Sequence, residues 1–283
     1  MLENNIFYYR KAAQNSVFLG VHRSKVIGNG ILFKQHQPLI NAPDPRHIDL
    51  RASLLNPFSQ YQVKSFQQQS RLDVFLLADL SASMGYHGNY NKPQAVADCL
   101  LSVAKSAHAT GDRFGFVGCG QVLNHQLLIS PANLQQGRVT DIAQQIKASI
   151  FTGQAGSLLQ AADYLPNSSA LVFLLSDFYM PIKMIQQQMQ RLNRHTVVPL
   201  VLWDKKESCD LPRWGMMRIS DLEQGKTRTL WMRPALQKKI QRAFKQRKQQ
   251  LQHCFRSFGC EPLFMEQGYR AESISQYFLQ FEG

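Results

Sequence analysis

From residue 71 onward, short apolar runs alternate with segments of helical periodicity. Strands are predicted at residues 72–78, 122–129, 170–175 and 196–202, and residues 111–117 are interpreted as a turn that enters a further strand. Helical spacing of apolar residues predicts helices at 92–109, 135–148, 156–164 and 184–194. Strands that alternate with helices are typical of a mostly parallel sheet covered by helices on both faces. The pattern therefore predicts a domain of the α/β class over residues 71–283.

Residues 1–70 have a different pattern. Two apolar runs, 21–27 and 31–33, flank Gly28, Asn29 and Gly30. Asn-Gly between apolar runs favours a β-hairpin, because both residues tolerate positive φ. Residues 48–50 and 61–66 read as further short extended pieces. We expect a small N-terminal β-rich subdomain.

The last part of the chain adds four predicted elements. Residues 216–219 and 227–232 are expected to form a second hairpin, and residues 234–258 a long amphipathic helix. Residues 261–265 are expected to be a last strand and residues 273–281 a last helix.

Two aspartates stand where predicted buried strands end. Asp79 and Asp177 each follow an apolar run, and ligands of open α/β sheets bind at the carboxyl ends of the strands. Ser81 and Ser83 follow Asp79 closely, so one carboxylate and two hydroxyls form a compact group of hard oxygens. Oxygen ligands suit Mg²⁺, which keeps several of its waters. A divalent-cation site is therefore predicted, with Mg²⁺ favoured and Mn²⁺ or Ca²⁺ also fitting.

These residues resemble the metal-ion-dependent adhesion site of von Willebrand factor A domains. Asp79-x-Ser81-x-Ser83 matches its first motif and Asp177 its last. The resemblance implies a loop hydroxyl between them: Ser157 takes the position where the family has Thr, and Thr152 is a competing candidate. It also implies a von Willebrand factor A-like, Rossmann-like fold, in which Ser81, Ser83 and Ser157 bind the cation directly and Asp79 and Asp177 partly through water.

Residues before this site narrow the resemblance. Gly28-x-Gly30, Asp44-Pro-Arg46 with Asp49, and the run 62–66 are similar to the bacterial family called domain of unknown function 58. Leu50 stands where that family usually has Trp. The resemblance covers roughly residues 15–235, and members are typically encoded beside MoxR-type AAA ATPases. It implies such an ATPase as partner, in chaperone-like assembly or maturation of a client.

Composition narrows the class of protein further. Of the 283 residues 44% are apolar, enough for a sizeable core. No apolar run approaches the roughly 20 residues of a membrane-spanning helix, and the first residues do not read as a signal peptide. We expect a soluble, cytoplasmic protein. The five cysteines include no Cys-x-x-Cys pair, which favours reduced core residues over disulfides or a zinc site.

The net charge of +13 raises attraction to acidic partners. No acidic residue lies between Glu223 and Glu261, where basic residues crowd the predicted helix. A solvated outer face is the favoured interpretation of this helix; the alternative is a partner-binding surface made by Lys238, Lys239, Arg242 and Lys245. No aromatic stacking motif accompanies these residues, so sequence-specific nucleic-acid recognition is not expected.

No enzyme motif accompanies Asp79. A haloacid-dehalogenase-like phosphatase needs an acid at position 81, where this chain has Ser81, and a serine nucleophile needs a histidine base and an elbow that the sequence lacks. We therefore predict a non-catalytic, metal-dependent adaptor whose open metal position accepts an acidic residue of a partner. The alternatives are a metal-dependent phosphohydrolase and a nucleic-acid-binding module that uses the helix at 234–258.

Overall fold

The computed structural model describes Ile6, Tyr8 and residues 19–28, 32–40, 45–58, 60–131, 136–154, 156–208, 211–220 and 227–280. The chain divides into two compact units. The α/β unit comprises residues 1–8, 73–109 and 113–283, and the small β unit comprises residues 9–72 and 110–112. Each unit is described separately below.

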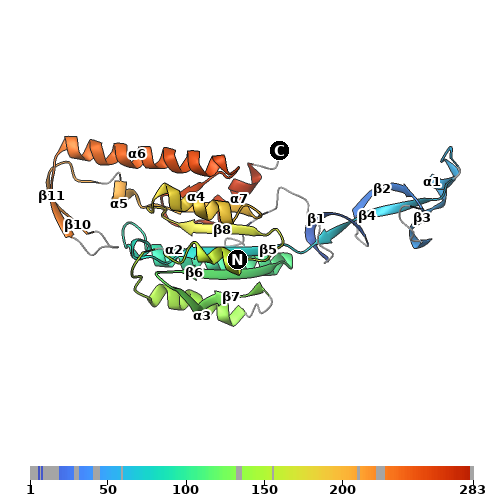
Figure 1. Cartoon of the computed structure of the whole chain (residues 1–283), viewed down its shortest axis with the longest axis horizontal. Helices are drawn as coiled ribbons and strands as arrows, with labels where there is room; N and C mark the ends of the chain where they lie inside the picture. The colour runs from blue at the N-terminus through green and yellow to red at the C-terminus, as the bar shows by residue number, and fades with distance from the viewer. Residues whose placement is uncertain are drawn as a thin grey trace. The chain divides into compact units, whose positions relative to one another are not determined.

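A six-stranded sheet forms the centre of the α/β unit (Figure 1). Its order is β12-β9-β8-β5-β6-β7, and only β7 runs antiparallel to its neighbour. The strands are β5 (Asp73–Asp79), β6 (Arg113–Cys119), β7 (Leu123–Ile129), β8 (Leu171–Ser176), β9 (Thr196–Leu202) and β12 (Leu263–Met265). The mostly parallel sheet predicted from the apolar runs is confirmed. Its inner strands β5 and β8 are buried throughout, which explains why their sequences are continuously apolar.

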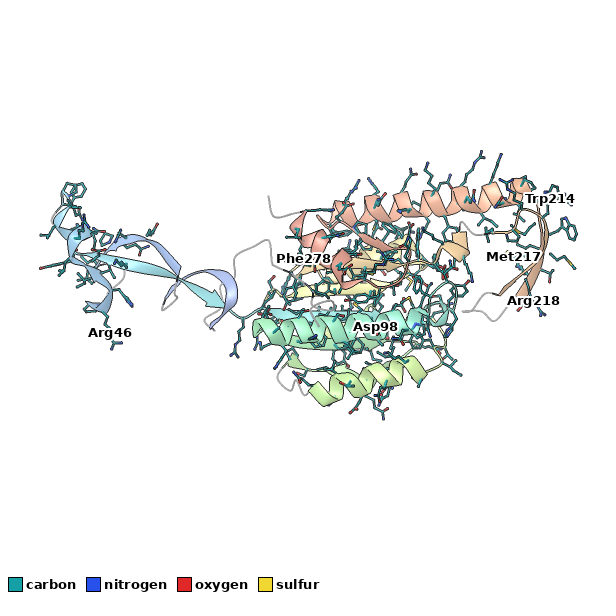
Figure 2. All side chains as sticks on the ribbon, turned by 180° about the vertical axis from the view of Figure 1, so that it is seen from behind. Arg46, Asp98, Trp214, Met217, Arg218 and Phe278 are labelled. Atoms are coloured by element: carbon teal, nitrogen blue, oxygen red, sulfur yellow. The ribbon has the colours of Figure 1, made fainter. Side chains whose placement is uncertain are left out.

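Helices cover both faces of this sheet, as predicted. Alternate strand residues point to opposite faces: Phe75 and Leu77 join a core with α4 and α6 residues, whereas Phe173 packs edge-on against Phe278 of α7 at 6.2 Å between ring centroids. Figure 2, seen from behind, shows α2 and α7 in front of the sheet. The helices are α2 (Lys92–Thr110), α3 (Gln136–Ala148), α4 (Ile182–Arg191), the short α5 (Lys205–Ser208), α6 (Pro234–Ser257) and α7 (Ala271–Leu279).

The helix predicted at 156–164 is shorter than expected. Only a 3₁₀ helix, η4 (Gln160–Tyr164), forms there, after a turn. The backbone N–H and the hydroxyl of Ser157 both donate to the carbonyl of Gly120, which holds this residue against the neighbouring loop. Pro166 follows closely and cannot continue a helix. A long loop therefore remains between α3 and β8, and it borders the predicted metal site.

The small β unit is built around one long strand. β4 (Gln62–Ser70) lies between β1 (Leu19–Gly28) and β2 (Leu32–Pro38), antiparallel to both, and also pairs with β3 (Ile48–Asp49). The predicted pairing of 21–27 with 31–33 is therefore wrong. The Asn-Gly signal is local. It carries no information about β4, a later strand that hydrogen-bonds to both runs and so separates them. Leu50, expected in an extended piece, instead starts α1 (Leu50–Leu54), whose first turn is capped by the Asp49 carboxylate.

Two remaining predictions concern the end of the chain and the cysteines. β10 (Gly215–Ser220) and β11 (Thr227–Met232) form the expected antiparallel hairpin, followed by the expected long helix α6. Cys99, Cys119, Cys254 and Cys260 are free thiols, the first three buried, while Cys209 lies outside the described residues. Among the residues that the structure describes, no helix is both long and apolar enough to cross a bilayer.

Candidate metal centre

Asp79 ends β5, and its carboxylate is held in place from two sides. The side chain is 1% exposed. Its Oδ1 accepts a hydrogen bond from the Ser81 backbone N–H at 2.9 Å, and its Oδ2 accepts one from the Ser176 hydroxyl at 2.6 Å. Both bonds fix the orientation of the carboxylate while leaving lone pairs on each oxygen for a further ligand.

The two serines that follow Asp79 bring their hydroxyls together. Ser81 Oγ lies 3.2 Å from Ser83 Oγ, at the start of the short 3₁₀ helix η2 (Ala82–Gly85). The N–H of Ala82, between them, donates to the carbonyl of Gly153 at 3.0 Å. This bond joins the Asp79 loop to the loop that carries the predicted third hydroxyl.

That third loop offers two hydroxyls in different environments. Ser157 is buried, and its Oγ donates to the Gly120 carbonyl at 2.8 Å, beside the end of β6. Thr152 is exposed and lines a cavity of about 310 Å³ together with Leu80 and Gly120. A hydroxyl that donates one hydrogen bond still has lone pairs for a cation. Burial and the fixed orientation favour Ser157 over Thr152.

Asp177 follows β8 and faces the same edge of the sheet. It is 2% exposed, and its Oδ1 accepts from the Tyr179 backbone N–H at 3.4 Å. Phe178 between them has a positive φ of 53°, a conformation in which a bulky residue is strained. The Trp203 indole N–H donates to the Asp177 carbonyl at 2.7 Å. The loop is therefore held in an unusual conformation that keeps this carboxylate at the edge.

A buried lysine is the contact that links Asp177 to the Ser83 loop. Lys92, the first residue of α2, is 0% exposed, and its Nζ lies 3.4 Å from Asp177 Oδ2 and 3.5 Å from the Ser83 carbonyl oxygen. It also pairs with Glu207 Oε1 at 3.0 Å, between the rings of Tyr86 and Tyr179. The Lys92 ammonium group thus contacts both the Ser83 loop and Asp177, which belong to the first and last of the predicted motifs.

Sequence reasoning missed Lys92, Glu207 and Ser176. Glu207 is 115 residues from Lys92, so no local pattern connects them. One signal was present: a lysine in the first turn of a helix is unfavourable next to the positive end of the helix dipole, which indicates a partner elsewhere. Ser176 was visible only as the neighbour of Asp177.

The charges of the two aspartates are coupled. The pKa of Asp79 is raised from 3.8 to about 6. Burial is the largest cause, the negative charge of Asp177 adds to the rise, and the hydrogen bonds from Ser176 and Ser81 oppose it. Two buried carboxylates repel each other, and of these two Lys92 pairs with Asp177 and not with Asp79. A cation between them would relieve this repulsion.

The donor set matches a hard divalent cation. It consists of the Asp79 and Asp177 carboxylates and the hydroxyls of Ser81, Ser83 and Ser157, all of them oxygen ligands. No group of three or more His, Cys, Asp or Glu side chains close enough to hold a metal occurs in the described ranges. Such a donor set suits Mg²⁺, Mn²⁺ or Ca²⁺ better than Zn²⁺.

The four basic residues predicted to bind a partner are all exposed on α6: Lys238, Lys239, Arg242 and Lys245. Lys245 lines a small cavity of about 160 Å³ with Trp203, the residue that holds the Asp177 carbonyl. Two neighbours on the same helix have structural roles. Arg247 donates to the carbonyls of Phe178 and Met180, and Lys248 pairs with Glu266.

Residues 45–250 match the model of the protein family of unknown function DUF58. The chain belongs to the DUF58 family. The resemblance seen in the sequence is thereby confirmed, and the sheet order with one antiparallel strand gives this DUF58 chain the von Willebrand factor A-like α/β fold. No curated protein matches the sequence.

Several solved structures are similar to this DUF58 chain at low identity. A mussel byssus protein, proximal thread matrix protein 1, is 19% identical over 47% of this chain and 38% of its own length, with a TM-score of 0.33. An aerotolerance-related membrane protein from Bacteroides fragilis is 12% identical over 74% of this chain and 97% of its own, with a TM-score of 0.40. The SpRpn10 VWA domain is 13% identical over 74% and 95%, with a TM-score of 0.37.

Proposed function

We propose that this chain is a non-catalytic protein-interaction module whose binding site is a divalent-cation centre. The observation that carries the proposal is the convergence of three loops at one edge of the sheet. The Ser81–Ser83 hydroxyl pair lies beside the buried Asp79 carboxylate, and Lys92 joins this loop to Asp177. Hydroxyls and carboxylates gathered at one place are suited to holding a hard cation.

The residues of the proposed metal centre have different roles. Ser81, Ser83 and Ser157 would contribute hydroxyl ligands, and Asp79 and Asp177 would contribute the negative charge, partly through water. Ser176 orients Asp79. A bound cation would supply an open position for a carboxylate of the partner. Because the protein provides few direct ligands, the partner's carboxylate would add a substantial share of the binding free energy.

The chemistry of the site indicates an acidic partner. The exposed bases of α6 would attract an acidic surface and raise its association rate. Membership of the DUF58 family makes a MoxR-type AAA ATPase the partner we propose. The pair would act on a client in chaperone-like assembly or maturation.

The test is capture of the purified MoxR-type ATPase of the same genome on a surface that carries this protein. Capture should occur with Mg²⁺, disappear with EDTA and return when Mg²⁺ is restored. Asp79→Ala and Ser81→Ala should abolish it, while the control Asp141→Ala, which removes an exposed carboxylate of α3, should leave it intact. Circular dichroism should show that all variants keep the fold.

Two results would contradict the proposal. Capture that survives both EDTA and Asp79→Ala would exclude the metal-centred mechanism. Magnesium-dependent hydrolysis of p-nitrophenyl phosphate that Asp79→Asn abolishes would instead show a phosphohydrolase.

A further inference from the structure

The β10–β11 hairpin exposes large apolar side chains. Trp214, Met216 and Trp231 are 66%, 75% and 56% exposed, although apolar side chains of this size are usually buried. Figure 2 labels Trp214, Met217 and Arg218 on this hairpin, next to the N-terminal end of α6. Three such residues on one two-stranded element form a patch, which we call the hairpin patch.

The pairing of the strands places these residues on one face. Met216 lies directly opposite Trp231, and Arg218 lies opposite Thr229, two positions along the same strands. Residues two apart on a strand share a face, so Met216, Trp231 and Arg218 do so. The other face carries Met217 and Leu230, which are half-buried. The hairpin is fixed at its base by Met232, which is fully buried.

The hairpin patch lies in the most basic part of the chain. Residues 211–260 contain twelve Lys and Arg and only two acidic residues, Asp221 and Glu223, so most of the net charge of +13 is concentrated there. Four arginines, at positions 213, 218, 228 and 233, belong to or flank the hairpin and are exposed. In the part of the chain that the structure describes, none of these four has an ion-pair partner. A surface of this composition is complementary to a dense array of negative charge.

We propose that the hairpin patch attaches the protein to the surface of an anionic lipid bilayer. Trp214, Met216 and Trp231 enter the interfacial layer, where Trp side chains are favoured because the ring is apolar and the N–H can still hydrogen-bond. Arg218, which shares their face, and Arg233, which follows Trp231 by two residues in extended backbone, contact the phosphates, with their apolar stems against the lipid. This attachment is separate from the proposed metal centre and does not require it.

The shape of the patch favours lipid over an acidic protein. An exposed two-stranded hairpin presents separate indole rings to the solvent. A protein partner would need a matching hollow for each ring, whereas a bilayer interface accepts amphipathic rings in any arrangement. The positive charge alone would suit any polyanion. The exposed indole rings are the feature that favours a lipid interface.

The first measurement is co-sedimentation of the full chain with vesicles. Vesicles of phosphatidylcholine mixed with phosphatidylglycerol should bind the protein, and vesicles of phosphatidylcholine alone should not. Added salt should weaken binding, and EDTA should leave it unchanged. Arg218→Gln with Arg233→Gln should weaken binding roughly fivefold or more, whereas Lys105→Gln with Arg194→Gln, two exposed bases elsewhere, should have a much smaller effect.

The second measurement tests the apolar side chains. Met216→Ser with Trp231→Ser should weaken binding by about tenfold or more. The matched control Val122→Ser with Ile150→Ser removes two side chains that are 78% and 88% exposed, outside the basic region, and should leave binding unchanged.

Tryptophan fluorescence supplies a readout that does not depend on truncating the hairpin. The chain has three tryptophans, and Trp203 is buried. Anionic vesicles should shift the emission of the wild type to shorter wavelength, and should not shift that of the Trp214→Phe, Trp231→Phe variant, whose only indole is Trp203. Absence of binding, absence of a wavelength shift, or equal binding by the hairpin and control variants would overturn the proposal. So would polyglutamate binding that is as strong as vesicle binding and equally sensitive to Trp231→Ser, since this would indicate an acidic protein.

Discussion

Asp79 and Asp177 are two buried carboxylates at one edge of the sheet, and Lys92 is the buried cation that contacts one of them. Lys92 is shared with Glu207, so it balances only part of the negative charge. Burial, and after it the negative charge of Asp177, raise the pKa of Asp79. A divalent cation at this edge would bind more tightly than the number of protein ligands alone suggests, because it also removes the repulsion.

This coupling predicts the pH dependence of metal binding. The folded pKa of Asp79, about 6, is above its ordinary value of 3.8, so the metal-free fold favours the protonated acid. As pH rises from 3.8 to 6, the free energy of unfolding should fall, at most by about 1.4 kcal/mol for each unit of pKa difference. Cation binding requires the ionised form, so Mn²⁺ affinity should rise with pH up to about 6 and then level off. Titrations with Mn²⁺ on either side of pH 6 measure this; an affinity independent of pH would contradict it.

Lys92 should matter more for stability than its exposed neighbours on α2. Lys92→Met keeps the volume but leaves Asp177 and Glu207 without a cation, and we expect a loss of about 3–5 kcal/mol in unfolding free energy. Mg²⁺ should recover part of the loss, seen as a larger rise in Tm than in the wild type. Lys105→Met, at an exposed position of the same helix, is the control. Equal losses in the two variants would mean that the buried ion pairs contribute nothing.

The loop hydroxyl of the metal centre can be assigned by a pair of substitutions. Ser157→Ala should weaken Mn²⁺ binding by at least about tenfold, because this buried hydroxyl is held next to the Asp79 loop. Thr152→Ala should leave the affinity unchanged, because Thr152 is exposed and lines the adjoining cavity. The opposite ranking would assign Thr152 as the ligand.

At the scale of elements, the apolar pattern predicted most of the α/β unit. β5, β8 and β9 are buried on both faces, so each appears in the sequence as an apolar run of strand length. The helices α2 and α6 follow from their periodicity. The failures have one cause: they depend on partners distant in sequence. β4 separates β1 from β2, and the Gly120 carbonyl holds Ser157 in a turn.

In the candidate site, too, local features could be predicted from the sequence, and contacts between distant residues could not. Asp79, Ser81, Ser83 and Asp177 could be named from the sequence because strand ends and short spacings are local features. Lys92 and Glu207 could not, because their ion pair forms only when α2 and α5 are brought together by the fold.

The close approach of Gly115 in β6 to Phe75 in the paired strand β5 predicts how a substitution there changes stability. A Cβ on Gly115 would clash with the Phe75 ring, so Gly115→Ala should cost about 1–3 kcal/mol in unfolding free energy. Gly137 in α3 has open space at the corresponding position, and Gly137→Ala should instead stabilise by up to about 1 kcal/mol, because alanine favours helix. Urea unfolding measures both. If both variants lost stability equally, close packing at Gly115 would not be the cause.

At the scale of the whole molecule, charge is distributed unevenly. The proposed metal centre gathers acidic groups at the carboxyl edge of the sheet, while the hairpin and α6 carry most of the positive charge. A cation at the acidic edge would make that edge attractive to a carboxylate of a partner, and the basic region would attract anionic surfaces independently. The two proposals can therefore fail separately: EDTA should abolish partner capture and leave vesicle binding unchanged.

The most direct test of the central claim is a titration of the metal-free protein with Mn²⁺, followed by electron paramagnetic resonance. The wild type should bind one Mn²⁺, which Mg²⁺ displaces. Ser81→Ala with Ser83→Ala should abolish binding, while Ser257→Ala, at an exposed serine at the end of α6, should not. Equal binding by the wild type and the double variant would show that the hydroxyl pair holds no metal, and the proposed mechanism of partner binding would be wrong.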